Sequence, residues 1–413
     1  MPDNISYPHT AITSWSGFIY QGKVAIYHAL TLLDHSDYVL QLDSLEDFAI
    51  LDAAGNAVCM HQVKALKSQF FGTYSSEFSR LKSKAENEGC QNAFFHLAKT
   101  ITNKTILEIE SEYSPVKVYQ YGSNYYCAVD EIDRKIEEKL VELMPIYHCG
   151  DTSKNSIEYA HKVRIYLDQI VTKKVLAIHE LIHNNTTSEA EAAYRETIRL
   201  QEFITLLQED LNQRVEDEYY FYLLLGDFRR YYLEFCNENE DELENSDLFR
   251  LGLIMTQIDQ FDKAQMIRFI KNIMPHRLFK FENISDYKDH TLQSSEIKDG
   301  FFRILFEIKN APSCRDTTLL RWLSSDKSFS PSSINLGQFH SKKICNDIIK
   351  NALDNDLDLM FEGSHIITTD IDVDSISLPE VLAKFDSNQR QHIMGWKKVT
   401  LMSLANAKRG IDE

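Results

Sequence analysis

The chain opens with apolar residues that recur at helical spacing. A helix over residues 17–33 would place them on one face, which predicts an amphipathic helix. These apolar residues are Ile19, Val24, Ala25, Ala29, Leu32 and Leu33.

The pattern then changes to short extended runs separated by turn-forming residues. We expect strands at 38–42, 47–51 and 57–66, the last two joined by the turn sequence DAAGN. A charged helical stretch (75–101), a strand-like segment (105–111) and an alternating segment (116–129) follow. The first part of the chain is therefore predicted to be an α/β unit.

After about residue 130, helical periodicity dominates and strand signals largely disappear. A change of composition near 284–300 suggests a linker before a smaller mixed module, with a helix at 341–354 and an extended segment at 364–371. The predicted fold class is α+β: an α/β domain with a mixed sheet flanked by helices, a mainly helical region and a small mixed C-terminal module. The expected domains are 1–135, 136–283 and 284–413.

Charge limits the partners that the protein can have. The 44 basic and 62 acidic residues give a net charge of −18, whereas a constitutive DNA-binding protein usually carries the opposite sign. Contact with DNA would therefore need a partner or a local basic surface. One such surface could contain Lys64, Lys67, Arg80, Lys82 and Lys84. The alternative is an acidic protein that never touches nucleic acid.

Two further features of composition bear on location. The N-terminal residues lack the basic and apolar regions of a signal peptide, and the longest apolar run, at 219–225, cannot span a bilayer. The seven cysteines show no C-x-x-C spacing, which fits reduced thiols rather than a disulfide framework. We expect a cytoplasmic protein without membrane contact.

Gly17, Gly22 and Lys23 have the spacing of a phosphate-binding loop. Such a loop needs Ser or Thr after the Lys to hold Mg²⁺, and this chain has Val24 there. The bulky residues between the glycines also suit a helix better than a phosphate nest. We interpret the stretch as part of the first helix.

The segment from Asp47 to Lys64 carries the most informative chemistry. Metal-dependent phosphodiester cleavage needs carboxylates to hold Mg²⁺ and a Lys to orient water or stabilise developing negative charge. Asp47 opens one expected strand, and Gln62 and Lys64 lie two residues apart on the next, so both point to one face. Gln62 can ligate Mg²⁺ through its amide oxygen.

Asp47 followed by Gln62-Val63-Lys64 resembles the active-site signature of the PD-(D/E)XK restriction-endonuclease fold, in its QxK variant. The chain is most similar to the nuclease domains of bacterial anti-phage effectors, namely the CD-NTase-associated DNA endonucleases and the effectors of Lamassu or ABC-three-component systems. Those domains begin with a G-x-x-Y-Q helix, which corresponds here to Gly17–Gln21, followed by an acidic strand and Q-x-K.

The resemblance implies a Mg²⁺-dependent DNA endonuclease, with Mn²⁺ as a possible substitute. Asp47 and Gln62 would ligate the metal with Asp43 or Glu46, Lys64 would act at the phosphate, and Gln21 would support the site from the first helix. These catalytic and metal residues are Gln21, Asp43, Glu46, Asp47, Gln62 and Lys64. The implied partners are double-stranded DNA, an SMC-like ATPase, a small accessory subunit and further copies of the chain.

Two alternatives remain open. Asp43 stands where many relatives have Glu, and the chain is acidic, so it could be a catalytically inactive adaptor that keeps the nuclease fold. The sequence HELIH at 179–183 also matches the zinc-protease motif, with His179 and His183 as ligands and Glu180 as base. It lacks the further His of the longer motif and a clearly placed third ligand, so zinc is not the expected cofactor. Near the nuclease residues, Cys59 is expected to be a small core residue and His61 to support the metal site.

Overall fold

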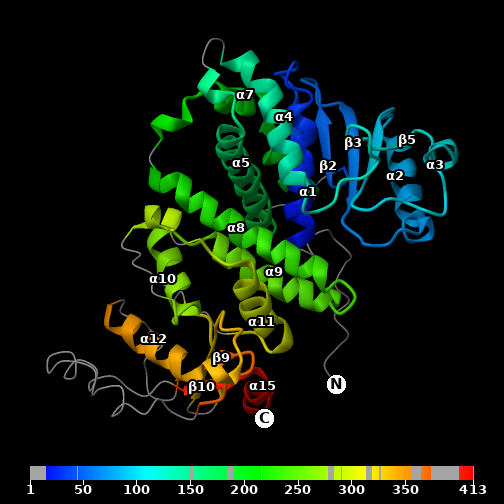
Figure 1. Ribbon diagram of the computed structural model, residues 1–413. Helices are drawn as coiled ribbons and strands as arrows, with labels where there is room; N and C mark the ends of the chain where they lie inside the picture. Colours follow the sequence, from blue (N-terminus) through cyan, green and yellow to red (C-terminus); the bar gives the residue numbers. More distant parts are fainter. Residues whose placement is uncertain are drawn as a thin grey trace. The chain divides into compact units, whose positions relative to one another are not determined.

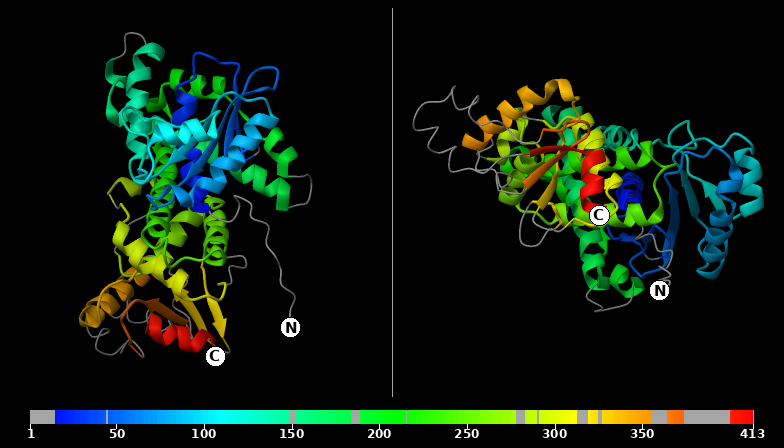
Figure 2. Two further views of the ribbon diagram at one scale, coloured as in Figure 1. Left: turned by 90° about the vertical axis from the view of Figure 1, so that its right-hand side faces the viewer. Right: turned by 90° about the horizontal axis from the view of Figure 1, so that it is seen from below.

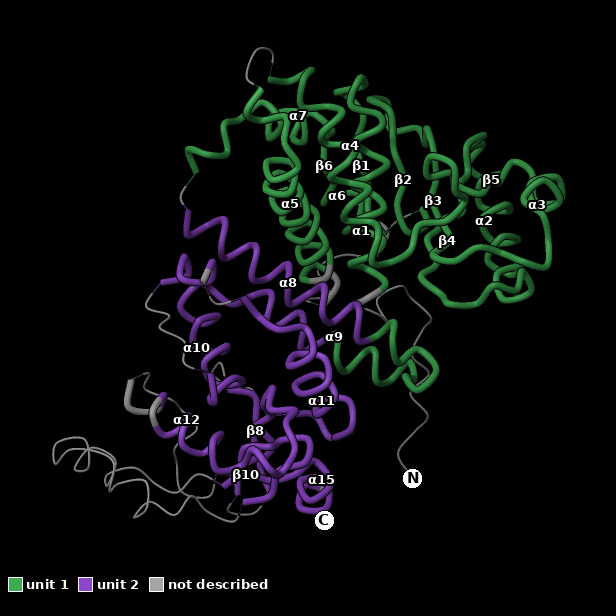
Figure 3. Tube along the Cα trace, in the orientation of Figure 1, with its two compact units in different colours: residues 1–215, 236–252 green, residues 216–235, 253–413 purple. Residues whose placement is uncertain are grey.

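The computed structural model describes residues 15–43, 45–148, 152–183, 189–214, 216–277, 283–289, 291–312, 319–324, 327–354, 364–373 and 400–412. The chain divides into two compact units, residues 1–215 with 236–252 and residues 216–235 with 253–413 (Figure 3). The predicted α+β class is confirmed, with a mixed sheet near the N-terminus, a mostly helical middle and a small mixed sheet near the C-terminus. The domain boundaries expected after residues 135 and 283 stay predictions.

The first unit contains a six-stranded mixed sheet (Figure 1). Its strand order is β5-β4-β3-β2-β1-β6; the β6-β1-β2-β3 pairs are antiparallel, and β3-β4-β5 are parallel. The strands are β1 (Val39–Leu42), β2 (Phe48–Leu51), β3 (Ala57–Lys64), β4 (Ala93–Leu97), β5 (Val116–Val118) and β6 (Ile198–Arg199).

The three strands predicted first form two consecutive hairpins. Between β1 and β2 the backbone N–H of Asp43 donates to the carbonyl of Asp47 (3.0 Å), with Asp43 in the left-handed region at φ 53°. Between β2 and β3 the side chain of Asp52 accepts from the N–H groups of Ala54 and Asn56 (both 2.9 Å). This local side-chain bonding explains why the run DAAGN makes the expected turn.

Helices cover both faces of this sheet. On one face lies α1 (Trp15–Leu30), which also packs on α4 (Ile132–Tyr147) and α5 (Ile157–His183). On the other lies α2 (Ser75–Asn87), where Phe78 stacks on Phe95 of β4 with ring centroids 3.9 Å apart. Two further views show α1 and α2 on opposite sides of the strands (Figure 2). Alternate residues of β3 therefore meet different helices.

The Gly17–Lys23 stretch is part of α1, as expected, and its residues serve helix packing. A Cβ atom at Gly22 would lie 3.0 Å from Val171 of α5, so glycine permits the close approach of the two helices. The Lys23 ammonium pairs with the Asp133 carboxylate of α4 at 2.5 Å. The residues that mimic a phosphate loop thus attach α1 to the neighbouring helices.

Two predictions in this region are wrong. Residues 105–111 were expected to be a strand, but α3 (Ile106–Tyr113) begins there, because Thr105 and Glu108 form a reciprocal capping box at its N-terminus. The helical stretch expected at 75–101 ends at Asn87; Gly89 then adopts φ 65°, and β4 follows. The five residues of β4 are all buried or nearly so, a pattern typical of an inner strand.

The segment after α5 is also more divided than its helical periodicity indicates. The segment forms α6 (Glu189–Arg195), the short strand β6 and α7 (Leu200–Gln208). In β6, Arg199 and Ile198 pair with Val39 and Leu40 of β1. Pairing with a distant strand therefore overrides the local helical pattern.

The second unit combines helices with a four-stranded sheet of order β10-β9-β8-β7. Its strands are β7 (Trp322–Ser324), β8 (Lys327–Pro331), β9 (Ser364–Thr368) and β10 (Thr400–Ser403). Two helices span the unit boundary, α8 (Glu216–Glu238) and α9 (Asn245–Asp259); the others are α10 (Lys263–Ile273), α11 (Arg303–Glu307), α12 (Ser341–Asp354) and α15 (Leu404–Asp412).

The residues near 284–300 do not form the expected linker. Tyr287 and Phe301 are fully buried, and the Phe301 ring packs edge to face on Phe228 of α8 and Phe269 of α10. An added Cβ at Gly300 would meet the Ser333 backbone at 2.6 Å, so this segment lies tightly against its neighbours. The segment is polar in composition, yet it contributes buried residues to the core.

Among the described residues, no helix combines the length and the apolar composition needed to cross a bilayer.

Candidate active site on the α2 face of the sheet

A hairpin loop holds the predicted carboxylates. Residues 43–47 connect β1 to β2, and the loop closes through the hydrogen bond from Asp43 N–H to the Asp47 carbonyl. The side chain of Glu46 is only 3% exposed, and Asp47 is 8% exposed. Two neighbouring carboxylates are thus nearly removed from water, which is costly unless other groups compensate their charge.

Asp47 is joined directly to strand β3. Its Oδ2 atom accepts hydrogen bonds from the side-chain amide of Gln62 and from the backbone N–H of Val63, the latter at 2.5 Å. This contact follows from the antiparallel register, which pairs Phe48 with His61 and so places Asp47 beside Gln62. The structure therefore brings together two of the predicted residues that lie fifteen positions apart.

Burial raises the pKa of Asp47 to about 7. The hydrogen bond from Val63 and the charge of Lys64 act in the other direction, whereas the charges of Glu46 and Asp43 add to the increase. Without a cation, Asp47 is a carboxyl group that holds its proton up to neutral pH. A divalent cation beside it would favour the ionised form.

Helix α2 completes the site with a layer of charged side chains. The Arg80 guanidinium donates to Gln62 Oε1 at 2.6 Å and to Glu46 at 3.1 Å, and it pairs with Glu77 at 2.9 Å. Lys84 lies 3.4 Å from Glu46, and Lys64 lies 3.6 Å from Glu77. Because Arg80 can only donate, the Gln62 oxygen faces Arg80 and the amide nitrogen faces Asp47.

Five of the six predicted residues converge on this face. Asp47, Gln62, Glu46 and Lys64 belong to one network, and Asp43 is close enough to influence the pKa of Asp47. Gln21 does not join them: it lies on α1, which packs on the opposite face, and it makes no hydrogen bond to Asp47, Gln62 or Lys64 among the described residues. Its role stays a prediction.

The donor set suits a hard divalent cation in part. Asp47 and Glu46 offer carboxylate oxygens, and Glu46 Oε1 is buried without a hydrogen-bond partner among the described residues, although Lys84 lies 3.4 Å away. Oxygen ligands of this kind are those that Mg²⁺ prefers. The Gln62 oxygen, however, already accepts from Arg80. In this arrangement the side chain of Gln62 orients Asp47. To ligate a metal as well, Gln62 would have to share its oxygen between Arg80 and the ion.

The opposite face of β3 carries a cluster that sequence reasoning missed. His61 points toward α1, where its ring lies 4.1 Å from that of His28, so it does not support the carboxylate site. His28, Cys59 and His61 bring three possible ligand atoms within 4.8 Å of one another. Strand alternation separates Cys59 and His61 from Gln62 and Lys64, but nothing in the sequence indicates that His28 faces them.

Burial controls the ionisation of this second cluster. It lowers the pKa of His28 to about 4, lowers that of His61 well below the usual range, and raises that of Cys59 to about 12. The imidazoles are therefore neutral at physiological pH.

The HELIH motif forms the end of α5, which stops at His183. The side chains of His179 and His183 lie outside the described residues, so the zinc-protease alternative stays a prediction.

The comparison with known families gives a match over residues 116–371. The matching family is the C-terminal domain 1 of the ABC-three component (ABC-3C) systems, and it covers more than half of the chain. The chain belongs to this ABC-3C family. No curated protein and no solved structure matches the chain.

The ABC-3C segment begins at β5, so it includes neither the carboxylates nor Lys64. It nevertheless contributes β5 and β6, the two edge strands of the six-stranded sheet. The four central strands, which precede the segment, thus form one structural unit with part of the ABC-3C domain.

Proposed function

We propose that this chain is the DNA-cutting effector of an ABC-3C anti-phage defence system, and that it hydrolyses phosphodiester bonds of double-stranded DNA with Mg²⁺. The observation that carries the proposal is the position of Asp47. It is a nearly buried carboxylate, it is held by Gln62 of β3, and Lys64 follows on the same face of the strand. Its burial is costly for a carboxylate of purely structural role and suits a ligand of a cation.

Each residue of the site has a task that follows from its position. Asp47 and Glu46 would hold Mg²⁺ or Mn²⁺, with Asp43 adding negative charge nearby. When bound, the ion supplies Lewis-acid stabilisation of the negative charge at the phosphate. Gln62 fixes the orientation of Asp47 through its amide nitrogen. The Lys64 ammonium, which is 27% exposed, can orient a water molecule and stabilise the developing charge.

The cationic side chains of α2 would allow this face to bind a polyanion such as DNA. The side chains of Arg80 and Lys84 are 54% and 40% exposed. The exposed parts of these side chains can contact DNA phosphates while Arg80 and Lys84 stay paired with Glu46. Local positive charge of this kind would offset the overall charge of −18 at the point of DNA contact.

The proposed partners follow from the family and the chemistry. Membership of a three-component system supports an assembly with other subunits, for which we propose an SMC-like ATPase and a small accessory subunit. Since one site cuts one strand at a time, cleavage of both strands would need two copies of this chain.

A second candidate, an adaptor that keeps the fold without catalysis, is favoured by one observation. The Gln62 oxygen is bound to Arg80, and Lys64 is paired with Glu77, so internal partners satisfy both groups. In an adaptor these contacts would simply stabilise the attachment of α2 to the sheet.

Plasmid cleavage separates the two candidates. The full chain, alone and together with its partner subunits, is incubated with supercoiled plasmid in Mg²⁺ or in EDTA. We expect cutting only with Mg²⁺, and Lys64→Ala should slow it by about a hundredfold to a thousandfold. Lys99→Ala, which changes an exposed lysine outside the network, is the matched control.

Circular dichroism must show that the Lys64 variant is folded. Cutting by Lys64→Ala at the wild-type rate would contradict the proposed role of Lys64. If the complete assembly contains folded protein and cuts no DNA under either condition, the adaptor is the better description.

A further inference from the structure

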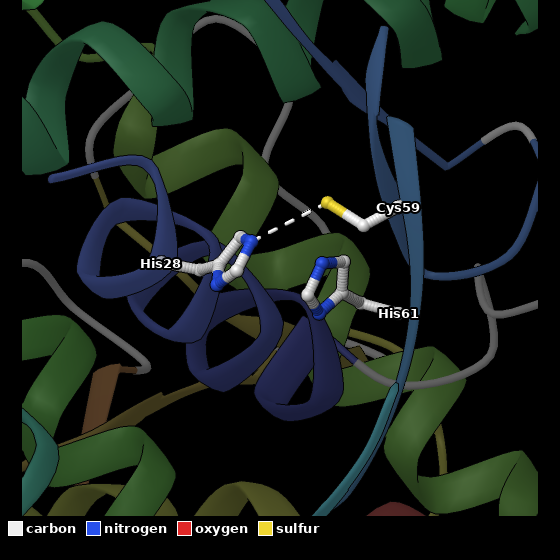
Figure 4. A group of neighbouring side chains, drawn as sticks. All are labelled: His28, Cys59 and His61. Atoms are coloured by element: carbon white, nitrogen blue, oxygen red, sulfur yellow. Dashed lines mark hydrogen bonds between the residues drawn. The ribbon is translucent and has the colours of Figure 1, made fainter. Parts of the chain in front are cut away.

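A buried cluster of His28, Cys59 and His61 lies on the face of β3 that is remote from the carboxylates (Figure 4). His28 comes from α1, and the other two come from β3, two residues apart. His61 is fully buried, Cys59 is 4% exposed and His28 is 6% exposed. His28 Nε2 lies 3.4 Å from Cys59 Sγ, and the picture shows a nitrogen of His61 turned toward the same space.

The imidazole nitrogens that point away from the cluster are all held by other side chains. His28 Nδ1 lies 3.1 Å from the Tyr119 hydroxyl, and His61 Nδ1 lies 2.8 Å from His96 Nε2. His96 Nδ1 in turn lies 2.7 Å from the Tyr121 hydroxyl. Metal-binding histidines typically have their second nitrogen fixed in this way, because such contacts set the tautomer and the orientation of the ring.

The remaining nitrogen, His61 Nε2, is the unexplained atom. It is buried and has no hydrogen-bond partner among the described residues. A neutral imidazole carries one N–H. If His61 Nδ1–H donates to His96, and His96 Nδ1–H donates to Tyr121, the lone pair of His61 Nε2 faces the cluster. An unsatisfied buried nitrogen costs about 1–3 kcal/mol, and a cation at this point would remove that cost.

We propose that His28 Nε2, Cys59 Sγ and His61 Nε2 bind one Zn²⁺ ion, which fastens α1 to β3. Two nitrogens and a sulfur are typical ligands of zinc and are unsuitable for Mg²⁺. Zinc bonds of about 2.0 Å to nitrogen and 2.3 Å to sulfur place tetrahedral ligands about 3.6 Å apart, close to the 3.4 Å between His28 Nε2 and Cys59 Sγ.

The surroundings shield the proposed ion from solvent. The ring of His61 is stacked on Phe48 at 4.2 Å and on Phe94 at 5.2 Å between centroids, so the cluster is enclosed by apolar rings. The competing explanation is a simple hydrogen bond from the Cys59 thiol to His28, which accounts for two of the three groups and leaves His61 Nε2 unsatisfied. The ion is separate from the proposed nuclease metal, since Gln62 and Lys64 leave β3 on the other face.

The test begins with the full chain as purified. Elemental analysis after extensive dialysis without chelator is expected to give about one zinc per chain. After removal of the metal, titration with Co²⁺ as a spectroscopic probe should produce visible bands together with a near-ultraviolet sulfur-to-cobalt charge-transfer band. That second band reports a thiolate ligand, which no carboxylate site can provide.

Variants identify the ligands. Cys59→Ser should abolish the charge-transfer band, and His61→Gln should weaken Co²⁺ binding by at least about a hundredfold. Cys90→Ser is the matched control, because Cys90 is also buried in the same unit but faces the α2 side. Asp47→Asn should leave the band unchanged, which keeps this result independent of the nuclease proposal.

Several outcomes would overturn the inference. The inference is wrong if the folded wild-type chain contains no zinc and shows no cobalt charge-transfer band. It is also wrong if the chain contains copper instead of zinc, or if the charge-transfer band persists in the Cys59→Ser variant. If Cys59→Ser and His61→Gln fail to fold, the zinc content and the charge-transfer band of the wild-type chain decide the question.

Discussion

The two faces of strand β3 differ in the chemistry that they carry. On the α2 face, Gln62 and Lys64 join carboxylates and the exposed cations of α2. On the α1 face, Cys59 and His61 meet His28 in an enclosed, aromatic environment. Carboxylates, an amide and cationic groups thus occupy one side, and imidazoles and a thiol the other.

The difference shows how one strand can serve two purposes. Because side chains alternate, four residues from 59 to 64 divide into two pairs without interfering. The α2 face is accessible through half-exposed cations, so it can meet a macromolecule. The α1 face is enclosed, and a single ion is the occupant that we propose for it. The comparison predicts that the first face governs DNA cutting and that the second governs the binding of zinc.

The largest effect should come from the ionisation of Asp47. In the metal-free chain its pKa is about 7, against an ordinary value of 3.8. Between these values the folded chain binds a proton that the unfolded chain releases, so stability decreases as pH rises from about 4 to 7 and stays lower above. The displacement of about three pH units corresponds to about 4 kcal/mol. Urea unfolding in EDTA at pH 5 and pH 8 should show the part of this loss that falls above pH 5, about 2.7 kcal/mol.

The Asp47→Asn variant should lack this pH-dependent loss of stability. In the wild-type chain, excess Mg²⁺ at pH 8 should make the loss smaller. Asp52→Asn is the control, because Asp52 is exposed and hydrogen bonds from the turn lower its pKa, so it titrates outside the window. Equal pH dependence in the wild-type chain and Asp47→Asn would show that Asp47 is not the group responsible.

A smaller effect, on the rate of plasmid cutting, should show whether the α2 side chains act by orienting Gln62 or only through their positive charge. Arg80 holds the Gln62 amide at 2.6 Å, whereas Lys84 contacts Glu46 at 3.4 Å. Because loss of Arg80 lets Gln62 rotate away from Asp47, Arg80→Ala should slow plasmid cutting about a hundredfold, or about 2.7 kcal/mol. Lys84→Ala should slow it about tenfold or less. Equal losses would mean that charge alone matters.

Much of the α2 face could be predicted from sequence because its geometry is local. Asp47 and Gln62 lie on adjacent strands of a short hairpin, and Lys64 follows Gln62 by one strand repeat. Register and alternation were sufficient to bring these residues together. The same alternation shows that His61 faces the other way, so its expected support of the metal site was an avoidable error.

The remaining features of the fold and of the two faces depend on contacts between distant segments, which no local sequence pattern encodes. His28 meets Cys59 only because α1 packs on β3 in one particular rotation, and the two residues lie 31 positions apart. The two-residue strand β6 arises from pairing with β1 and interrupts a region of helical periodicity. Gln21 could be placed on a helix, but the sequence did not indicate which face of the sheet that helix covers.

The smallest effect tests the hydrogen-bonded support of the α1 face. Tyr121→Phe removes the hydroxyl that bonds His96 and should lower the free energy of unfolding by about 1 kcal/mol, measured with urea. Tyr125→Phe is the control, because that ring is 39% exposed. If the hydrogen bonds from Tyr121 through His96 orient His61 toward a metal, Co²⁺ affinity should also fall about tenfold. A loss of stability with unchanged cobalt affinity would mean that these tyrosine and histidine contacts serve packing, and that the α1 face needs no metal to explain them.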